Sequence, residues 1–179
     1  MIIKVRENLE LRVRVPEEAE ESFAVIDKNR EHLRKYLPWV DSTKSAEDIK
    51  QVIIKWQNAF EDKSEVVVGI YFDNKYAGNM GLHDINKNNN SAEIGYWLAE
   101  NYQGKGIMTD CVRALTDYGF NELDLNRIFI CCVTENRKSR AVPERLGYIQ
   151  EGILQDGIRL YEIYHDVVMY GMVKRNWVK

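Results

Sequence analysis

A short run of glycines around one lysine is the stretch of this 179-residue chain with the clearest chemical potential. Gln103-Gly104-Lys105-Gly106 precedes a helix-like segment, and its two glycines keep side chains away from any group that approaches the backbone. Free N–H groups at a helix start, the positive end of the helix dipole and the lysine ammonium together suit a phosphate group. A tight turn that needs glycine would have the same local sequence, so the run by itself leaves both interpretations open.

Two common phosphate-binding loops do not fit this run. A nucleoside-triphosphate loop needs Ser or Thr directly after its Gly-Lys pair, but Gly106 follows Lys105. A dinucleotide-binding loop needs a third glycine three residues after the second, where this chain has Thr109. The pattern Gln/Arg-x-x-Gly-x-Gly/Ala does fit, through Gln103, Gly106 and Met108. Met108 replaces the small final residue of that pattern, so we expect the packing there to differ.

The residues on either side of the run predict a strand before it and a helix after it. Residues 91–98 alternate in character and place Glu93, Gly95 and Trp97 on one face, which is typical of a strand. From residue 107 onward the apolar period changes to steps of three and four, as in an amphipathic helix. The helical stripe consists of Met108, Cys111, Val112, Leu115 and Gly119.

With these surroundings, the loop resembles that of the GNAT superfamily of acetyl-CoA-dependent N-acetyltransferases. Residues 92–98, Ala-Glu-Ile-Gly-Tyr-Trp-Leu, and the later Asn136-x-x-Ser139 are similar to its RimJ/RimL branch, which acetylates ribosomal-protein N-termini. The resemblance covers residue 9 to the C-terminus. It implies transfer of an acetyl group from acetyl-CoA to a primary amine by direct attack, with the N-terminal amine of a ribosomal protein as the first candidate acceptor. It also implies cofactor contacts from Trp97, Leu98, Gln103, Gly104, Lys105, Gly106, Ile107, Met108, Thr109, Asn136, Arg137 and Arg140.

Acetyl transfer to an amine also needs a group that takes the amine proton and one that protonates the departing thiolate. The family's usual proton donor is a tyrosine seven residues after the helix-starting Asn, but this chain has Pro143. Ser139 is the polar group that the RimJ/RimL pattern offers instead, although a hydroxyl at this position also suits capping of helix N–H groups. Glu93 is the candidate base, directly or through water, unless it is a solvated or ion-paired strand carboxylate. No cysteine has a visible activating partner, which agrees with direct attack.

Two other functions remain open on this sequence. The same chemistry on a small amine such as a polyamine, amino acid or drug would use the same cofactor site. A CoA-binding module without turnover would be consistent with the missing tyrosine.

Residues 36–39 carry two aromatic side chains that either pack a helix junction or, as in the family, help to cover an acceptor pocket. His165 is interpreted as structural, and His32 and His83 carry no functional signal.

Composition and charge restrict the class of protein. A chain with 45% hydrophobic and 30% charged residues is typical of a globular protein, and 179 residues predict one domain with a substantial core. A net charge of −3 gives no support for nucleic-acid binding. The sequence has no signal-peptide stretch and no run that approaches a membrane span. Three cysteines without metal-ligand spacing predict a reduced cytoplasmic protein with no metal.

The rest of the chain predicts an α/β fold, a mixed sheet with helices on both faces. We expect strands at 9–15, 66–72, 75–82, 127–133, 148–154 and around 166–172, helices at 16–35, 45–60 and 136–147, and turns at 73–74 and 156–157. Strands 91–98 and 127–133 flank one helix, so they should run parallel with a right-handed crossover. The GNAT resemblance adds that this pair splays apart and holds the pantetheine arm between Trp97-Leu98 and Val133-Thr134.

The C-terminal part predicts self-association. Its apolar side chains exceed what one face of one strand can bury, so we expect part of them to meet another subunit. They are Tyr161, Ile163, Tyr164, Val167, Val168, Met169, Tyr170 and Met172.

Overall fold

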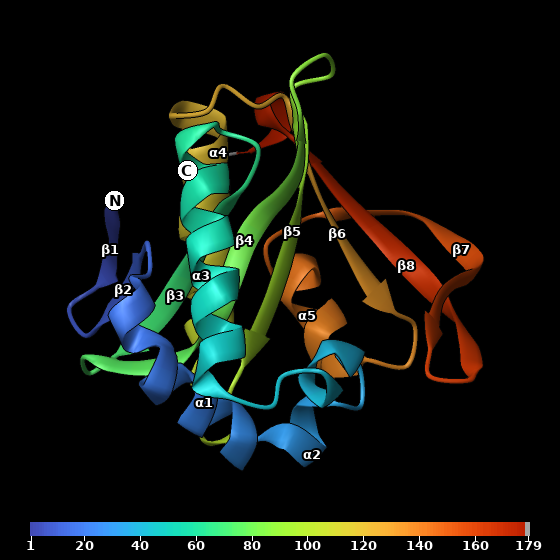
Figure 1. Cartoon of the computed structure of the whole chain (residues 1–179). Helices are drawn as coiled ribbons and strands as arrows, with labels where there is room; N and C mark the ends of the chain where they lie inside the picture. The colour runs from blue at the N-terminus through green and yellow to red at the C-terminus, as the bar shows by residue number, and fades with distance from the viewer. Residues whose placement is uncertain (178–179) are drawn as a thin grey trace.

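The computed structural model describes residues 1–177, and these residues form one mixed sheet flanked by helices (Figure 1). The strands lie in the order β1-β2-β3-β4-β5-β6-β8-β7. Their bounds are β1 Ile2–Arg6, β2 Leu9–Arg12, β3 Val66–Phe72, β4 Lys75–Asn86, β5 Ser91–Leu98, β6 Arg127–Val133, β7 Ile149–Leu160 and β8 Ile163–Val173. Within residues 1–177 every strand pairing is antiparallel except that of β5 with β6, which is parallel. The predicted α/β class and mixed sheet are confirmed.

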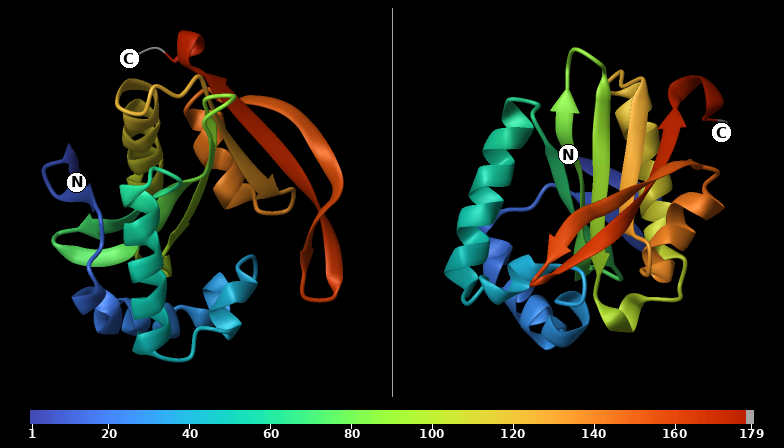
Figure 2. Two further views of the ribbon diagram at one scale, coloured as in Figure 1. Left: turned by 45° about the horizontal axis from the view of Figure 1, so that its top comes forward. Right: turned by 90° about the vertical axis from the view of Figure 1, so that its right-hand side faces the viewer.

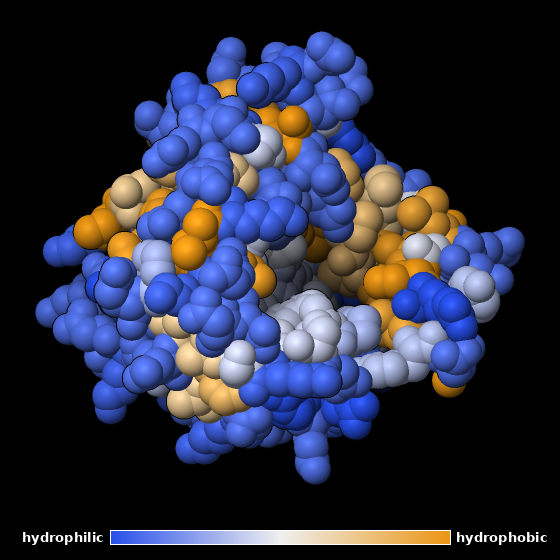
Figure 3. Space-filling view, in the orientation of Figure 1, coloured by the Kyte–Doolittle hydropathy of each residue, from blue (hydrophilic) through white to orange (hydrophobic). Residues whose placement is uncertain are grey.

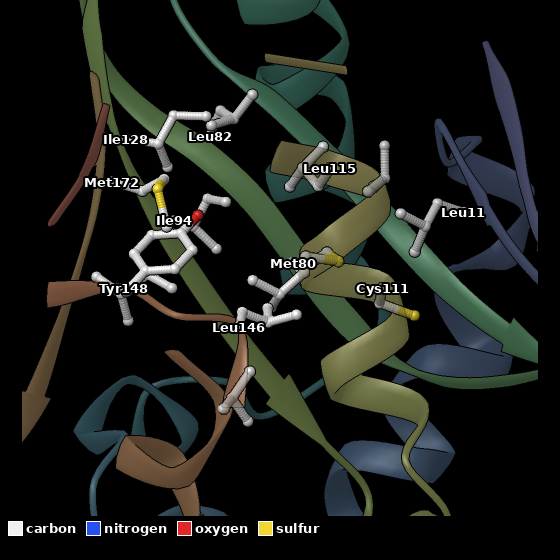
Figure 4. Packing of buried hydrophobic residues seen from close by; sticks show 14 of the residues in the cluster. Leu11, Met80, Leu82, Ile94, Cys111, Leu115, Ile128, Leu146, Tyr148 and Met172 are labelled. Carbon is white, nitrogen blue, oxygen red and sulfur yellow. The ribbon is translucent and has the colours of Figure 1, made fainter. Parts of the chain in front are cut away.

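Helices cover both faces of the sheet, as predicted (Figures 1 and 2). The helices are α1 Ala19–Lys28, α2 Arg30–Leu33, α3 Ala46–Glu61, α4 Ile107–Asn121 and α5 Arg137–Arg145, with 3₁₀ turns η1 Pro16–Glu18, η2 Pro38–Asp41, η3 Glu100–Tyr102 and η4 Lys174–Asn176. One face carries α1 and α3, whose buried side chains form a cluster with η2. The other face carries α4 and α5 over the larger core, in which Met80, Ile94, Leu115 and Tyr148 meet (Figure 4). No helix within residues 1–177 is both long and apolar enough to cross a membrane.

Helix α3 shows how local sequence sets these elements. The Ser45 hydroxyl accepts a hydrogen bond from the Asp48 N–H at 3.3 Å, and the Asp48 carboxylate accepts one from the Ser45 N–H at 2.9 Å. This reciprocal capping box fixes the helix start where it is predicted. Ile49 and Ile53 then fall on the buried face, while Val52 is 38% exposed.

The parallel strands diverge soon after they meet. They pair from Ser91 opposite Arg127 to Glu93 opposite Phe129, and beyond these residues β5 and β6 separate, with α5 visible between them (Figure 1). The predicted βαβ unit and the splay implied by the family are therefore confirmed. From Ile94 to Leu98, the β5 edge that faces β6 has no strand partner in the described part of the chain.

The expected turn at Asp156-Gly157 is wrong. Strand β7 continues through these residues to Leu160, and the hairpin turns at residues 161–162. Asp156 has a positive φ of 49° inside a register shift between Leu154 and Ile158, so the Asp-Gly pair forms a bulge in the strand. The Asp156 N–H is satisfied by the Asp166 carboxylate at 2.9 Å. The resulting long β7–β8 hairpin extends away from the rest of the sheet (Figure 2).

The N-terminal third differs from prediction at its boundaries. Strand β1 is not predicted by the sequence pattern, because it is a half-exposed edge strand, and β2 ends at Arg12 instead of residue 15. The expected helix 16–35 is a 3₁₀ turn followed by α1 and α2, with a break at Asn29. The Asn29 side chain donates to the Val25 carbonyl at 2.8 Å and accepts from the Glu100 N–H at 2.9 Å. These contacts hold the break against the loop before α4.

Candidate functional site

The glycines of the 103–106 loop are required by backbone conformation and leave open space in front of α4. Gly104 and Gly106 have φ of 75° and 73°, which side chains other than glycine rarely adopt. A Cβ added at either position would meet no atom within 4 Å. Gly106 is the N-cap of α4, so the unpaired N–H groups of its first turn border this open space. The turn interpretation is therefore correct, and the open space leaves room for a phosphate group, whose binding here stays a prediction.

The side chains of the loop are held by neighbours. The Gln103 amide nitrogen lies 2.7 Å from His32 Nε2, and its amide oxygen accepts from the Lys138 ammonium at 2.9 Å. Burial lowers the pKa of His32, which favours the neutral ring that can accept this hydrogen bond. The Lys105 ammonium lies 5.6 Å from the ring centroid of Phe72 and is exposed at the loop surface. The sequence assigned no function to His32, and no local pattern connects it to Gln103.

The predicted cofactor residues at the start of α4 and the end of β5 differ in burial and in the face of the sheet that they occupy. Ile107 is buried under the loop, whereas Met108 and Thr109 are half-buried in the first turn of α4. Leu98 packs in the α4-side core, and the Trp97 ring lies on the opposite face, 6.1 Å from Trp39. Trp97 and Leu98 can therefore reach a ligand in the β5–β6 gap through the free β5 backbone. Such an edge suits the amides of a pantetheine arm, which would bind as an added strand does.

Ser139 lies where α5 faces β5, in a cluster of three polar side chains. Its hydroxyl is 3.3 Å from the Tyr96 hydroxyl and 3.2 Å from the Cys132 sulfur. The Tyr96 hydroxyl donates to the Ser139 carbonyl at 2.8 Å. Because Pro143 has no N–H, this carbonyl lacks its usual helical partner, and Tyr96 replaces it. The α5 cap is supplied by Asn136, whose side chain accepts from the Ser139 N–H at 3.3 Å. The Ser139 hydroxyl is thus directed at β5 and β6.

The two arginines of the predicted cofactor set lie at the start of α5. Arg137 is exposed at the first position of the helix. Arg140 donates to the Tyr170 hydroxyl at 3.0 Å and to the Thr134 carbonyl at 2.9 Å, and lies 3.6 Å from Glu144. These contacts join α5 to β8 and to the end of β6, so a direct phosphate contact from Arg140 stays a prediction.

A cavity of about 390 Å³ opens on the α3 side of β5. Figure 3 shows this face hollowed beside α3. The lining is mostly aromatic and apolar, and among the described residues it includes no aspartate or glutamate. It consists of Arg14, Ile26, Leu37, Trp39, Ser42, Thr43, Ile49, Val52, Trp56, Val67, Tyr76, Asn79, Met80, His83, Gly95, Tyr96 and Trp97. Trp39 comes from the segment 36–39, so its position supports the acceptor-pocket interpretation of that segment.

The candidate base Glu93 lies close to this cavity but does not line it. Burial raises the pKa of Glu93, while contacts with Cys131 and His83 act in the opposite direction. His83 is paired with Glu93 across β4 and β5 and does line the cavity, with Nδ1 3.5 Å from a Glu65 oxygen. The sequence carried one usable signal for His83, since alternation along β4 places it on the same face as Asn79 and Gly81.

No group of three or more His, Cys, Asp or Glu side chains within residues 1–177 is arranged to hold a metal ion. The three cysteines are free thiols, and burial raises the pKa of Cys111 to about 12 and that of Cys132 above its ordinary value.

Known proteins match this chain along nearly its whole length. Residues 8–149 match the sequence family described as an acetyltransferase (GNAT) domain. The chain is 39% identical over 175 residues to the putative ribosomal N-acetyltransferase YdaF of Bacillus subtilis (strain 168), covering 97% of this chain and 96% of that protein. It is 30% identical over 171 residues to the ribosomal-protein-serine acetyltransferase of Escherichia coli (strain K12), covering 96% of each. A structure of RimL, a ribosomal L7/L12 alpha-N-protein acetyltransferase in complex with coenzyme A, matches 97% of this chain and 98% of that chain, with a TM-score of 0.93 and 30% identity.

Proposed function

The chain belongs to the GNAT family of acetyltransferases, and from this premise we propose that it acetylates the N-terminal amine of a protein. The observation that carries the choice of acceptor is the cavity beside the β5–β6 gap, which has aromatic walls and, among the described residues, no lining carboxylate. An α-amine attached to a peptide needs an open site of this kind, because the rest of the peptide must leave the cavity. The names of YdaF and the E. coli relative make ribosomal proteins the first class to test.

The proposed reaction is a direct transfer. The neutral amine attacks the thioester carbonyl carbon, the C–S bond breaks, and the CoA thiolate takes a proton. The loop at residues 103–108 holds the CoA phosphates, and the β5 edge beyond Glu93 holds the pantetheine amides. In this proposal Ser139, whose hydroxyl faces the gap and is oriented by Tyr96, protonates the thiolate and then takes up a proton from solvent.

Acetylation of a small amine is the alternative reaction. A polyamine carries several positive charges, and binding it in a cavity requires carboxylates that offset the cost of desolvation. Among the described residues the lining holds no such carboxylate, and its one basic residue besides His83, Arg14, is paired with Glu18. The lack of lining carboxylates disfavours a polycationic acceptor, whereas a neutral amino acid or drug amine remains compatible with the cavity.

A CoA-binding module without turnover is the second alternative, because the family's usual tyrosine is replaced by Pro143. The pair of Ser139 and Tyr96 offers a different source of hydroxyl groups at the same helix, which favours an active enzyme.

An enzyme that acts on ribosomal proteins would work in the cytoplasm, and we place this protein there on that account.

The test is release of free CoA thiol from acetyl-CoA in the presence of separate acceptor pools. Peptides that carry the N-terminal sequences of ribosomal proteins should give thiol release and acetylated peptide, whereas spermidine should give neither. Thiol release with spermidine alone would replace the proposed acceptor by a small amine. Acetyl-CoA binding without thiol release from any pool would favour the module without turnover.

A further inference from the structure

The cavity holds one side chain suited to take a proton near neutral pH. Among the described residues, its lining includes four residues whose side chains are charged or can titrate: Arg14, Tyr76, His83 and Tyr96. The arginine is permanently protonated, and burial raises the pKa of both tyrosines above the ordinary value for a phenol. We propose that His83 accepts the proton of the attacking amine, an assignment that rests on the acetyl transfer proposed above.

The ring of His83 lies against the backbone of two glycines. A Cβ built on Gly81 would come within 2.9 Å of His83 Nε2, and one built on Gly95 within 3.4 Å of the same atom. The missing side chains therefore give the ring room to lie across β4 and β5. His83 is 34% exposed, so its imidazole remains accessible from the cavity.

This placement puts a base and an acid on opposite sides of β5. The His83 ring contacts Gly95 on the cavity side. The next residue, Tyr96, lines the same cavity, and its hydroxyl reaches Ser139 on the α5 side. An acyl group held in the β5–β6 gap at this level would have the acceptor cavity on one side and Ser139 on the other.

Charged and titratable groups from several elements surround His83. Glu65, before β3, lies 3.5 Å from Nδ1, and Glu93 on β5 is the cross-strand neighbour. Asp84 follows on β4 itself, and Cys131 on β6 lies beyond Glu93. Helix α3 presents Ile49, Val52 and Trp56 to the cavity. Arg14 shares the lining, but its charge is met by Glu18 at 3.8 Å.

In the proposed step, the amine proton moves to His83 as the acetyl group moves to the amine nitrogen. The amine nitrogen forms the new C–N bond as the C–S bond breaks, and the proton that leaves this nitrogen goes to Nε2 of His83. With Nδ1 directed at Glu65, the ring becomes an imidazolium beside a carboxylate. It returns the proton to solvent through the cavity, and the thiolate is protonated separately.

The test compares His83→Gln with wild type at saturating acetyl-CoA and saturating peptide, from about pH 5.5 to about pH 9, across the histidine range. We expect kcat to fall by about 10²–10⁴, the usual contribution of a positioned base, and the acidic limb of the kcat profile to disappear. Acetyl-CoA affinity and melting temperature should stay close to wild type. His83→Ala should recover part of its activity when imidazole is added to the buffer.

The matched control is His165→Ala. His165 is also a histidine beside a carboxylate, with Nδ1 3.8 Å from Glu135, but it does not line the cavity. It should keep wild-type kcat and the acidic limb. A His83→Gln enzyme with wild-type kcat and an intact acidic limb would overturn the assignment while leaving acetyl transfer in place. Wild type that forms no acetylated product with any acceptor would overturn both proposals.

Discussion

At the scale of single residues, Pro143 explains why a tyrosine hydroxyl from β5 donates a hydrogen bond to a backbone carbonyl of α5. It leaves the Ser139 carbonyl without a helical N–H, and the Tyr96 hydroxyl fills that position at 2.8 Å. The single phenol proton is then committed to the carbonyl, so the Tyr96 oxygen is free to accept from the Ser139 hydroxyl. Tyr148, another tyrosine near α5, does not join this cluster, because its hydroxyl is hydrogen-bonded to that of Thr116 in the core at 2.7 Å.

The role of Ser139 as proton donor predicts a selective loss of turnover. Ser139→Ala should lower kcat by about 10²–10⁴, the range for a positioned acid. Acetyl-CoA affinity should barely change, because the hydroxyl acts on charge that develops in the transition state. Ser139→Thr keeps a hydroxyl and should retain more turnover than the alanine variant. A helix-capping role would instead cost about 1 kcal/mol of stability with near-normal kcat. Measurement of kcat, acetyl-CoA affinity and melting temperature distinguishes these two outcomes.

At the scale of elements, the loop before α4 is supported from two sides. Asn29 and His32, at the α1–α2 junction, reach Glu100 and Gln103, and Lys138 of α5 reaches Gln103 from the other side. These contacts connect elements on both faces of the sheet through one short segment. The loop that is proposed to bind CoA is therefore fixed by residues remote from it in sequence.

Gly106→Asp tests the phosphate assignment of this loop. The space around Gly106 is open, and aspartate tolerates positive φ better than most residues, so the variant should fold. Its negative charge would oppose the pyrophosphate, and loss of two or three charge-assisted bonds costs about 1.5–3 kcal/mol each. Gly106→Asn is the matched control, because it has similar size and backbone preference without the charge. Calorimetric titration with acetyl-CoA should show a much larger loss for Asp than for Asn, and equal affinities of wild type and Gly106→Asp would refute the assignment.

The burial of His32 predicts a pH dependence of stability. The folded pKa of His32 lies below its ordinary value of 6.5, so the unfolded chain takes up the proton first as the pH falls. His32 should therefore reduce the free energy of unfolding as the pH falls from about 6.5 toward the folded pKa, and contribute no pH dependence above that range. Denaturant unfolding of wild type and His32→Gln from about pH 5 to about pH 8 should show the wild type losing more stability on acidification. A difference between the two proteins that stays constant with pH would contradict this prediction.

Local signals were enough to predict many elements but few of the functional contacts. The Ser45–Asp48 box, the Asp73-Asn74 turn and the Asn136 cap act within a few residues, so sequence alone places them. Tyr96 and Ser139 are 43 residues apart, and their contact depends on how far β5 and β6 diverge. His83 and Glu65 likewise meet only when β3 and β4 pair. Asp156-Gly157 has the composition of a turn, but pairing with β8 makes it a bulge.

At the scale of the whole molecule, the β7–β8 hairpin leaves apolar side chains at the surface. Val167, Val168, Tyr170 and Met172 of the predicted association segment are buried within the chain itself. Ile163 and Tyr164 remain 63% and 59% exposed, and further exposed apolar residues come from the edge strand β7, namely Ile149, Ile153, Leu154 and Ile158. A surface of this kind is typical of an interface.

We therefore expect self-association through the hairpin. Ile163→Lys should shift the protein toward monomer, because it places a charge where apolar side chains would meet. Ile2→Lys is the control, since Ile2 is 65% exposed on β1, at the opposite end of the sheet order. Light scattering at micromolar concentration measures the mass of each variant. A wild type that is monomeric under these conditions would remove the prediction.

The central claim is that the enzyme acetylates a peptide α-amine, and the most direct measurement is mass spectrometry of one peptide in two forms. The first form has a free N-terminus and an internal lysine, and the second is identical except for a blocked N-terminus. With acetyl-CoA and enzyme, the account predicts one acetyl group on the first peptide, located by fragmentation on the α-amine, and none on the second. Acetylation of lysine in both forms, or of neither form while a small amine is acetylated in the same assay, would contradict it.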